Sequence, residues 1–580
     1  MKLSNKFKSL NHLSNLVKNN TSIGIGGHHF ARLPIALINK VLLHNPKNLE
    51  FISWSGGLAL ELFLQKNSIN KIQVCFSSLD IFGLAPTFRK ISEAKSMEVI
   101  DWSALGLIKA LRASQQNIDS EIFQYPWGSD LPNKTKFCKK FKDPKTKNEF
   151  AIVNSITIDN FLLHASRADE DGNVEILGPR ALDTIMAGAS KQVIVTVDEI
   201  VSRDILAKEK KGSLISKNFI TAIAHVPFGA YPTSSVPYYV TDYDDLKNTF
   251  SKKPLRLGLS FKKNKKFITK SNKLTLNYFI NYIKKNKLNS NLPNKVSTDE
   301  LMAFALANEY NNNSLCSSGA VSPLANVSYL LAKKIHAPKL ILTTMTYGHH
   351  DIAFRPMTLS FSEVLDRETC LNYWGGDDSY SIYYQNGQIT HEVIGAAQID
   401  KFGNVNNIEI KKKSGGFLRL PGQGGMADVS NLHQHFMCYV TKHSKLSFVD
   451  KVDYVSAGRG LFKDKDRIKA GLKPGNVKIF TNLCIFEKNK KTGLLEVSSI
   501  HKGITKSEIE QNTAFKVKYK KNYKITKSPS AKQLNILRDE VDPLNIRKLE
   551  FTSGEDRINL LEEILNKERK MIKQINLKEL

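Results

Sequence analysis

The sequence predicts an α/β protein made of two related domains, and three observations predict it. Strand-like apolar runs recur along the 580 residues, at 49–53, 72–76, 192–197, 340–344, 391–399 and 477–482. Helical patterns such as 103–111 and 328–335 lie between several of these runs, and strands that alternate with helices are typical of parallel sheets. Two stretches also resemble copies of each other, and a basic segment separates them.

The two copies span residues 22–53 and 314–344. Each predicts a strand, a turn of small residues, a helix, a proline and a second strand, so that Gly27 corresponds to Gly319. A second pair of similar stretches, 165–174 and 396–405, ends in Gly-Asn-Val in both halves. The two pairs have different offsets, which requires an insertion in the first half. Two pairs of similar stretches in the same order favour an internal duplication.

The composition divides the chain into four parts. Residues 251–297 are rich in Lys and Asn and predict a basic linker with a surface helix near 274–283. We therefore expect a first domain at 1–250, the linker at 251–297 and a second domain at 298–552. The tail, 553–580, predicts a helix for packing or oligomer contact, because its polar face mixes acids and bases. Its apolar face comprises Ile558, Leu561, Leu565, Ile572 and Ile575.

Charge and cysteine content narrow the class of protein. The net charge is +29, but the lysines are spread along the chain and no nucleic-acid-binding motif is present, so we expect no nucleic-acid partner. No apolar run reaches the roughly 18 residues that span a bilayer, so we expect no membrane partner. The six cysteines form no CxxC pair. We interpret them as reduced thiols of a cytoplasmic protein.

Two glycine-rich turns are candidate anion sites. Gly26 and Gly27 follow the first strand and precede His28, and the second turn contains Gly422, Gly424 and Gly425. Glycine lets the backbone approach a ligand closely, and free N–H groups there can bind a phosphate or an oxyanion. A tight turn without a ligand is the alternative, and the first turn lacks the GxGxxG dinucleotide fingerprint.

The histidines do not predict a metal site. His28 is followed by His29, and His349 by His350, and adjacent residues on a strand point to opposite faces. His433 and His435 could share a strand face, but no third ligand follows at a zinc-site spacing. We therefore expect no metal.

Asp101 is the candidate catalytic carboxylate of the first half. It ends a strand-like run and precedes the helical run at 103–111, which is where open α/β folds place ligand-binding groups. The alternative is that Asp101 only caps that helix.

Several of these motifs together resemble the glutaconate-type coenzyme A transferases. At 25–34, at Arg89 after 85–88, and at 158–174, 195–201 and 226–234, the first half is similar to their A subunit. At 395–406, 422–425, 451–458 and 537–543, the second half is similar to their B subunit. The resemblance implies that both are fused in one chain, as two related open α/β domains packed face to face. It also implies an active site at their interface and an acyl-CoA thioester as substrate.

One departure from the family concerns the catalytic glutamate of the B subunit. In the family this residue attacks the thioester and becomes a glutamyl-CoA intermediate. The matching position here is Thr343, and a hydroxyl lacks the charge and leaving-group chemistry of a carboxylate. A branch of ring-opening CoA-ester hydrolases also lacks this glutamate and uses, as a base, an acid of the A subunit. Asp101, upstream of 128–132, resembles that acid.

The resemblance leaves three functions open. The first is transfer of CoA between carboxylic acids, with another carboxylate in place of the glutamate. The second is hydrolytic C–C cleavage of a cyclic keto-acyl-CoA with Asp101 as base, in which water replaces the acid acceptor. The third is an inactive acyl-CoA-binding homologue. We expect coenzyme A as the only cofactor-like ligand, and a homo-oligomer paired through the terminal helix.

Overall fold

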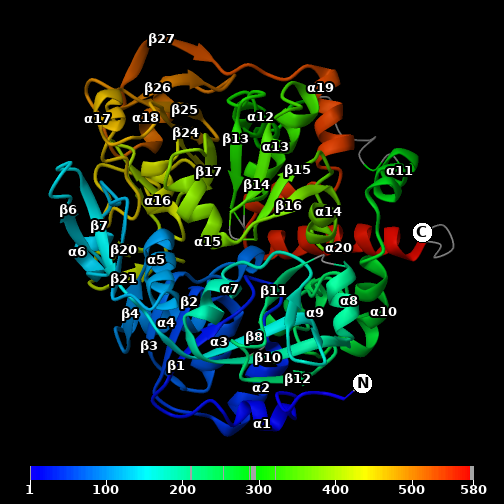
Figure 1. The fold of residues 1–580 in the computed structure, drawn as a ribbon. Coiled ribbons are helices and arrows are strands. Elements are labelled where there is room, and N and C mark those ends of the chain that lie inside the picture. The colour runs from blue at the N-terminus through cyan, green and yellow to red at the C-terminus, as the bar shows by residue number, and fades with distance from the viewer. Residues whose placement is uncertain are drawn as a thin grey trace.

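The computed structural model describes residues 2–209, 212–251, 254–286, 288, 295–319, 322–345 and 347–574. It contains two α/β halves stacked against each other (Figure 1), the first coloured blue to cyan and the second green to orange. Each half has one large, mostly parallel sheet flanked by helices. The predicted fold class is therefore confirmed. The predicted domain boundaries stay predictions, and part of the 251–297 linker lies outside the described residues.

The first half is built on a nine-stranded sheet. Its main path runs β11-β9-β8-β1-β2-β3-β4, and β10 and β12 extend it beside β8. The strands are β1 (Ser22–Ile25), β2 (Leu49–Ser55), β3 (Ile69–Phe76), β4 (Glu98–Asp101), β8 (Ile158–Asp169), β9 (Val174–Ile176), β10 (Ser190–Val201), β11 (Ser213–Ile215) and β12 (Ala222–His225).

The second half is built on an eight-stranded sheet in the order β14-β13-β17-β22-β24-β25-β26-β27. The strands are β13 (Leu315–Ser318), β14 (Ile341–Thr344), β17 (His391–Gly395), β22 (His435–Val440), β24 (Val477–Thr481), β25 (Cys484–Lys488), β26 (Leu495–Ile500) and β27 (Tyr519–Ile525). The expected single strand at 391–399 is wrong. The chain leaves this sheet after β17 and enters a small separate sheet as β18 (Gln398–Asp400).

The longer helices flank these sheets. In the first half they are α2 (Ile35–His44), α3 (Gly57–Gln65), α4 (Pro86–Ala94), α5 (Ala104–Gln115), α7 (Asp183–Gly188), α8 (Arg203–Glu209) and α9 (Tyr243–Phe250). The basic segment forms α10 (Phe261–Ser271) and α11 (Leu276–Asn286). In the second half they are α12 (Thr298–Ala307), α13 (Pro323–Ile335), α14 (Ser362–Thr369), α16 (Met426–Leu432), α17 (Asp464–Lys469), α18 (Lys506–Asn512) and α20 (Gly554–Gln574).

The duplicated segments adopt the same structure in both halves. β1, α2 and β2 form a parallel strand–helix–strand unit, and so do β13, α13 and β14. The next equivalent strand lies on the other side of the first, giving β8-β1-β2 in one half and β17-β13-β14 in the other. The 165–174 and 396–405 stretches form matching turns, in which the Asp169 and Asp400 carboxylates accept backbone N–H groups. This agreement supports the predicted duplication.

The insertion expected in the first half lies between β2 and β8. It contains β3, β4, their helices and a small three-stranded sheet of β5 (Ser120–Phe123), β6 (Lys139–Lys142) and β7 (Glu149–Asn154). This small sheet reaches up beside the second half (Figure 1). Asp130, between β5 and β6, donates its N–H to the Val455 carbonyl and accepts the Val455 N–H. The insertion therefore ties the two halves together.

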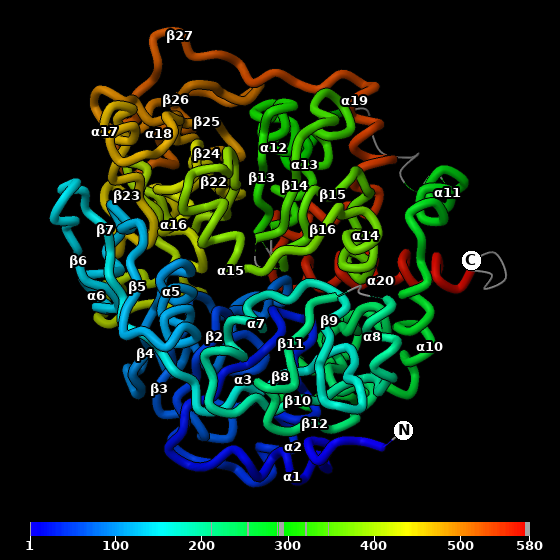
Figure 2. The backbone as a smooth tube through the Cα atoms, in the orientation of Figure 1, coloured from blue at the N-terminus to red at the C-terminus, as the bar shows by residue number. Residues whose placement is uncertain are grey.

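One hydrophobic core crosses from the first half to the second. Its buried members include Ile52 and Trp54 of β2, and Ile394 and Cys438 of the second sheet. Helix α20 runs along the boundary between the halves (Figure 2). Its Arg569 pairs with Asp244 of the first half, and its Glu568 carboxylate accepts the N–H of Leu359 in the second. The halves therefore form one packed unit.

The apolar face of the terminal helix is covered within its own chain. Leu561, Ile564, Leu565, Met571 and Ile572 are buried, whereas Ile558 is 54% exposed. Ile575 lies outside the described residues. The helix therefore packs against its own chain. Pairing of chains through this helix stays a prediction, and between Leu561 and Ile572 the helix has no free apolar face. Among the described residues, no helix has the length and hydropathy that crossing a bilayer requires.

Candidate functional site

A row of three side chains crosses β14, β13 and β17, three adjacent strands at one side of the second sheet. Thr343 of β14 is paired with Ser317 of β13, and Ser317 is paired with Glu392 of β17. Side chains of directly paired residues project to the same face of a sheet, because direction alternates along each strand. The Tyr384 hydroxyl, within a π-helical segment (Ser379–Tyr384), lies 2.5 Å from the Ser317 hydroxyl and donates to the Glu392 carboxylate at 2.8 Å.

Glu392 is a buried carboxyl group without a cationic partner. It is 1% exposed, and burial raises its pKa to about 7, although hydrogen bonds from Tyr384 and Ser317 act in the opposite direction. The nearest imidazole nitrogen, Nδ1 of His433, lies 3.7 Å away. Burial and the neighbouring arginines hold the pKa of His433 well below its usual range, so this ring is neutral at pH 7. Near neutral pH, Glu392 is therefore present both protonated and ionised.

Glu392 lines a cavity of about 160 Å³ at the junction of the two halves. The first half contributes His29, Trp54 and Phe76 to its wall. The second half contributes Met345, Asn407 and the glycine turn at 422–425. Among the described residues that line this cavity, Glu392 is the only carboxylic acid. Both halves line this cavity, and the family resemblance implies an active site at their interface.

The second glycine turn is docked on the end of β3. Gly422 forms a bridge with Phe76, and the Ser77 N–H donates to the Pro421 carbonyl at 2.7 Å. Gly422 has φ +113°, a conformation that other residues rarely adopt. At Gly425, a Cβ atom would lie 2.0 Å from the Tyr380 hydroxyl. The turn therefore requires glycine both for its conformation and for close packing.

Only part of this turn has N–H groups free for a ligand. The Gly422 N–H donates to the Asn407 carbonyl at 2.9 Å, and the Gly424 N–H donates to the Cys75 carbonyl at 2.8 Å. For the N–H groups of Gln423 and Gly425, no acceptor is found among the described residues. Of the three glycines of this turn that were predicted for oxyanion or CoA binding, Gly425 therefore has the free donor, at the start of α16.

The first glycine turn has no free donor at the corresponding place. The Gly26 N–H donates to the Leu162 carbonyl, and the Gly27 N–H donates to Asp183 at 2.8 Å. Asp183 also forms a buried ion pair with Arg32 at 2.7 Å. The His28 N–H donates to the Ala31 carbonyl. Anion binding by the N–H groups of Gly26, Gly27 and His28 is therefore not supported, because all three are already used inside the first half.

The His28 ring packs into the junction between the halves. Its centroid lies 4.7 Å from that of Trp54 and 5.1 Å from that of Tyr347. The Tyr347 hydroxyl donates to the His28 carbonyl at 3.3 Å. Burial lowers the pKa of His28 well below its usual range, so the ring is neutral. His28 therefore supports the wall that carries Trp54.

Asp101 lies at the junction but is occupied by an ion pair. It ends β4, is 5% exposed, and accepts hydrogen bonds from both terminal nitrogens of Arg419, at 2.8 and 2.5 Å. It does not cap α5, because Ser103 is the N-cap and accepts the Gly106 N–H. Asp101 does not line the cavity that contains Glu392. Its ion pair with Arg419 joins the two halves, and a catalytic role for Asp101 stays a prediction.

Thr343 lies further inside its strand, β14, than the family resemblance implied. Its hydroxyl donates to the His349 carbonyl at 2.9 Å, and the residue is buried. Thr343 does not line the cavity of Glu392, whereas Met345, two residues further on, does. The sequence did contain a signal for Glu392, namely a charged residue inside a strand-like apolar run.

The described residues contain no group of three or more His, Cys, Asp or Glu side chains arranged to hold a metal ion. His435 stacks on His391 with ring centroids 4.5 Å apart, and burial lowers the pKa of His435 to about 4 and that of His391 to about 3. His391 and His435 are thus packed, neutral rings.

Comparisons with known proteins show the family to which this chain belongs. A family model described as coenzyme A transferase matches residues 9–224 and 305–512. The 3-oxoadipate CoA-transferase of Pseudomonas knackmussii is similar through both of its polypeptides. Its B subunit is 30% identical over 246 residues, which are 42% of this chain and 92% of that polypeptide. Its A subunit is 26% identical over 213 residues, which are 36% of this chain and 75% of that polypeptide.

Two further proteins are similar to this chain. The A subunit of the cholesterol ring-cleaving hydrolase of Rhodococcus jostii is 24% identical over 241 residues, which are 39% of this chain and 79% of that polypeptide. The crystal structure of an acyl-CoA transferase from Escherichia coli O157:H7, in a thioester complex with CoA, superposes with a TM-score of 0.66. It is 14% identical and the match covers 92% of this chain and 96% of that one. This likeness concerns the fold of the whole fused chain.

Proposed function

The chain belongs to the coenzyme A transferase family, and from this premise we propose that it transfers CoA between carboxylic acids through a thioester on Glu392. The observation that carries the proposal is that Glu392 is the only described carboxylic acid lining the cavity beside the Gly425 N–H. The carboxylate that the sequence lacks at Thr343 is thus replaced two strands away in the same row of the sheet.

The reaction needs only groups that this site and the substrates supply. The ionised Glu392 carboxylate attacks the thioester carbonyl, the C–S bond breaks, and an acyl–Glu392 anhydride and the CoA thiolate result. The thiolate then attacks the side-chain carbonyl of Glu392 and releases the first acid as its carboxylate. A second carboxylate reverses these two steps, so that a new acyl-CoA leaves and Glu392 is regenerated.

Two features of the cavity suit these steps. The Gly425 N–H is available to hydrogen-bond the oxyanion that develops on the attacked carbonyl, and one such donor contributes on the order of 10²- to 10³-fold in rate. The Tyr384 hydroxyl holds one oxygen of Glu392, which orients the carboxylate. With its pKa at about 7, ionised Glu392 forms without a base and is a stronger nucleophile than an ordinary carboxylate.

Ring-opening hydrolysis with Asp101 as base is not favoured. The base would need a free carboxylate facing the cavity, and both oxygens of Asp101 are held by Arg419. Both halves of this chain match the two polypeptides of a CoA transferase and also the A and B subunits of ring-cleaving hydrolases, so the contacts of Asp101 carry this preference. The CoA transferase among these relatives is named for 3-oxoadipate, which is one candidate acceptor to be tested.

The experiment is to trap the intermediate. The protein is incubated with acyl-CoA and no acceptor, and the intact mass is measured for a CoA adduct. Borohydride then reduces the thioester, and peptide mass spectrometry locates the reduced side chain. We expect the adduct and the reduced residue at Glu392, and neither in Glu392→Gln.

Glu550→Gln is the matched control. Glu550 is also a buried carboxyl with a tyrosine hydroxyl donor, Tyr439, and burial raises its pKa to about 7, but it lines neither junction cavity. The control variant should form the adduct. An adduct on a different carboxyl group would contradict the assignment of Glu392. Release of free CoA in water without any adduct would instead support hydrolysis.

A further inference from the structure

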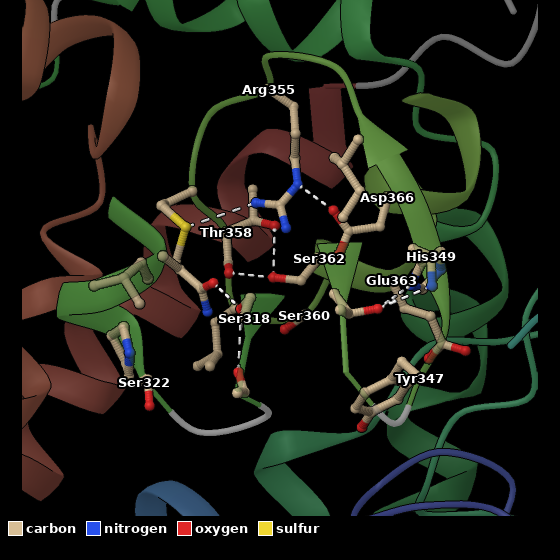
Figure 3. Close-up of a pocket in the computed structure, with 18 of the residues that line it drawn as sticks. Ser318, Ser322, Tyr347, His349, Arg355, Thr358, Ser360, Ser362, Glu363 and Asp366 are labelled. Carbon is tan, nitrogen blue, oxygen red and sulfur yellow. Dashed lines mark hydrogen bonds and ion pairs between the residues drawn. The ribbon is translucent and has the colours of Figure 1, made fainter. Parts of the chain in front are cut away.

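A second junction cavity, of about 170 Å³, shares part of its wall with the Glu392 cavity. Figure 3 shows it with ten of its residues labelled. Its arginine, Arg355, donates to Asp366 at 2.7 Å. His349 has an unpartnered Nε2, but the residue lines the cavity. A polar group in such a wall is accessible to water or to a ligand, so its lack of a protein partner needs no further explanation.

His433 is a buried histidine of a different kind. It is 0% exposed, it lines neither cavity, and neither of its ring nitrogens has a hydrogen-bond partner among the described residues. Three other buried histidines have partners for both ring nitrogens: His164, His443 and His501. Buried polar groups are normally paired, so the unpaired ring of His433 requires an explanation.

A carboxylate oxygen faces one of these ring nitrogens. Nδ1 of His433 lies 3.7 Å from Oε2 of Glu392, which is beyond hydrogen-bond length but too close for a water molecule to lie between them. The same oxygen accepts the Tyr384 hydroxyl at 2.8 Å, and the Tyr384 ring packs edge to face on His433 with centroids 4.4 Å apart. A shift of about 0.5–1 Å therefore brings Nδ1 into hydrogen-bond range of Oε2.

Helix α16 positions the ring on the buried side of Glu392. The N-cap of this helix is Gly425, whose N–H has no acceptor in the described part of the chain, and its C-cap is His433. The His433 carbonyl accepts hydrogen bonds from Arg459 and Arg467, which hold the backbone that carries the ring. The helix thus presents one donor to the cavity at its first end and an imidazole to Glu392 at its other end.

The titratable and charged groups around the pair set its protonation. Burial raises the pKa of each tyrosine that faces Glu392, so these side chains are neutral: Tyr329, Tyr380 and Tyr384. Three basic side chains face the ring of His433: Arg459, His391 and Arg467. Burial, together with these neighbours, holds the pKa of His433 well below its usual range. A ring that does not take up a proton interacts with a carboxylate as a hydrogen-bond donor rather than as a base.

We propose that His433 is a positioning residue for Glu392: in its Nδ1–H tautomer it donates to Oε2 when the carboxylate ionises, and it stabilises the nucleophile from the side away from the cavity. The proton stays on Nδ1 throughout the reaction. The hydrogen bond weakens again when Glu392 becomes an uncharged acyl group, because a charged acceptor binds a donor more strongly than a neutral one. This inference rests on the proposed transfer of CoA at Glu392, to which it adds a residue.

The test follows the pH dependence of adduct formation. The rate at which acyl-CoA gives the adduct on Glu392 should rise with pH, with a midpoint at about pH 7 in the parent protein. His433→Leu removes a donor to the charged form, which raises the pKa of Glu392. One hydrogen bond to a charged group corresponds to a shift of about 1–2 pH units. At pH 7 the variant should therefore react about 5- to 50-fold more slowly, and at pH 9.5 within about threefold of the parental rate.

Two further variants locate the donor. The amide nitrogen of His433→Asn is as many bonds from the backbone as Nδ1, and this variant should return the midpoint to about pH 7. His433→Gln places its amide nitrogen one bond further out, in the place of Nε2, and should keep the raised midpoint. His443→Leu is the matched control, because His443 is also buried with a lowered pKa but its ring nitrogens contact Thr481 and Thr513. It should leave the midpoint unchanged, although it costs stability.

A spectroscopic measurement requires no change at His433 and so does not depend on whether its variants fold. In protein labelled with ¹⁵N-histidine, one ring N–H signal should shift downfield as the pH rises through about 7, because its acceptor becomes charged. In Glu392→Gln the acceptor cannot ionise, and the shift should be absent.

The outcomes distinguish this inference from the transfer mechanism. If the adduct forms on Glu392 and His433→Leu keeps the parental midpoint, or no ring N–H signal follows the ionisation, His433 does not hold the carboxylate and the transfer mechanism stands. If the Leu and Asn variants shift the midpoint equally, the effect comes from packing and the role as donor is wrong. If the parent protein forms no adduct on Glu392, the transfer mechanism itself is wrong.

Discussion

The two halves of this chain share a scaffold but use the equivalent strand position in opposite ways. In the first half Ile25 of β1 is paired with Leu162 of β8, and both are buried among apolar side chains. Taking Gly27 as the counterpart of Gly319, the corresponding pair in the second half is Ser317 and Glu392. The same position is thus hydrocarbon in one copy and a polar network in the other.

The regions just beyond the ends of β1 and β13 also differ, because the first is filled and the second is open. Beyond β1, the buried ion pair of Arg32 and Asp183 fills the space and takes the Gly27 N–H. Beyond β13, Gly319 borders two cavities. A buried carboxyl without a cation costs stability, and a filled strand end does not bind a ligand. The difference teaches that the first half has become a supporting wall, whereas the second half keeps the polar groups that a reaction requires.

The largest expected effect comes from replacing Glu392 of the second half with the residue at the corresponding position of the first half. Glu392→Leu copies Leu162, and we expect CoA transfer to fall by roughly 10⁴-fold or more, because the nucleophile is gone. At pH 8 the variant should unfold at the same or a higher temperature, since an ionised buried carboxylate has been removed, worth about 1–3 kcal/mol. Steady-state kinetics and thermal melts measure the two effects. A variant that is active, or one that is strongly destabilised, would contradict this.

Asp101 tests the link between the halves. Asp101→Asn leaves the buried Arg419 guanidinium without its counter-charge, and we expect a loss of about 2–4 kcal/mol in stability. The rate constant kcat should stay within about 10-fold of that of the parent protein, because the side chain lines neither cavity. A role as general base predicts the reverse, with a rate loss of about 10²- to 10⁴-fold and an unchanged melting temperature. Kinetics and melts on the same sample decide between the two.

The pH dependence of stability tests whether buried carboxyl groups destabilise the folded protein near neutral pH. Burial raises the pKa values of Glu392, Asp428, Glu550 and Glu568 each to about 7. Between their ordinary values near 4 and about 7, the folded state holds more protons than the unfolded state. The stabilisation from these groups is therefore complete below about pH 4 and is lost as pH rises through 7.

Denaturant unfolding at closely spaced pH values between 5 and 8 measures this slope. The free energy of unfolding should fall as pH rises across that window. Glu550→Gln removes one of the four titrating groups and should make the fall shallower, although the variant starts from a lower stability at pH 5. A free energy that rises from pH 5 to pH 7 in the parent protein would show that other groups dominate.

The smallest expected effect is at Thr343, the residue that the sequence placed at the catalytic position. Thr343→Val keeps the shape of the side chain and removes one hydrogen bond to the His349 carbonyl, a loss of about 0.5–1.5 kcal/mol. Formation of the CoA adduct should be unchanged, because Thr343 lines neither cavity. Mass spectrometry of the acyl-CoA-treated variant checks this. A large loss of adduct would return Thr343 to the reaction.

The sequence by itself determined the fold class and the duplication. Period and composition are local properties, and the paired small-residue turns at Gly27 and Gly319 recur at corresponding places, so both could be predicted. The glycine turn at 422–425 was also predicted as a site, because its glycines allow close backbone approach. The family resemblance then placed this turn at the junction of the halves.

Only the tertiary structure decided which groups remain free to react. The sequence made Asp101 a candidate base. In the structure, both of its carboxylate oxygens accept hydrogen bonds from Arg419, more than three hundred residues away in sequence. Gly27 and Gly425 look alike in sequence, but Asp183 accepts the N–H of the first, and no described group accepts that of the second. Glu392 became a candidate only when strand register placed it beside Ser317 and below Tyr384. Hydrogen-bond partners and burial come from long-range packing, which no local pattern in the sequence records.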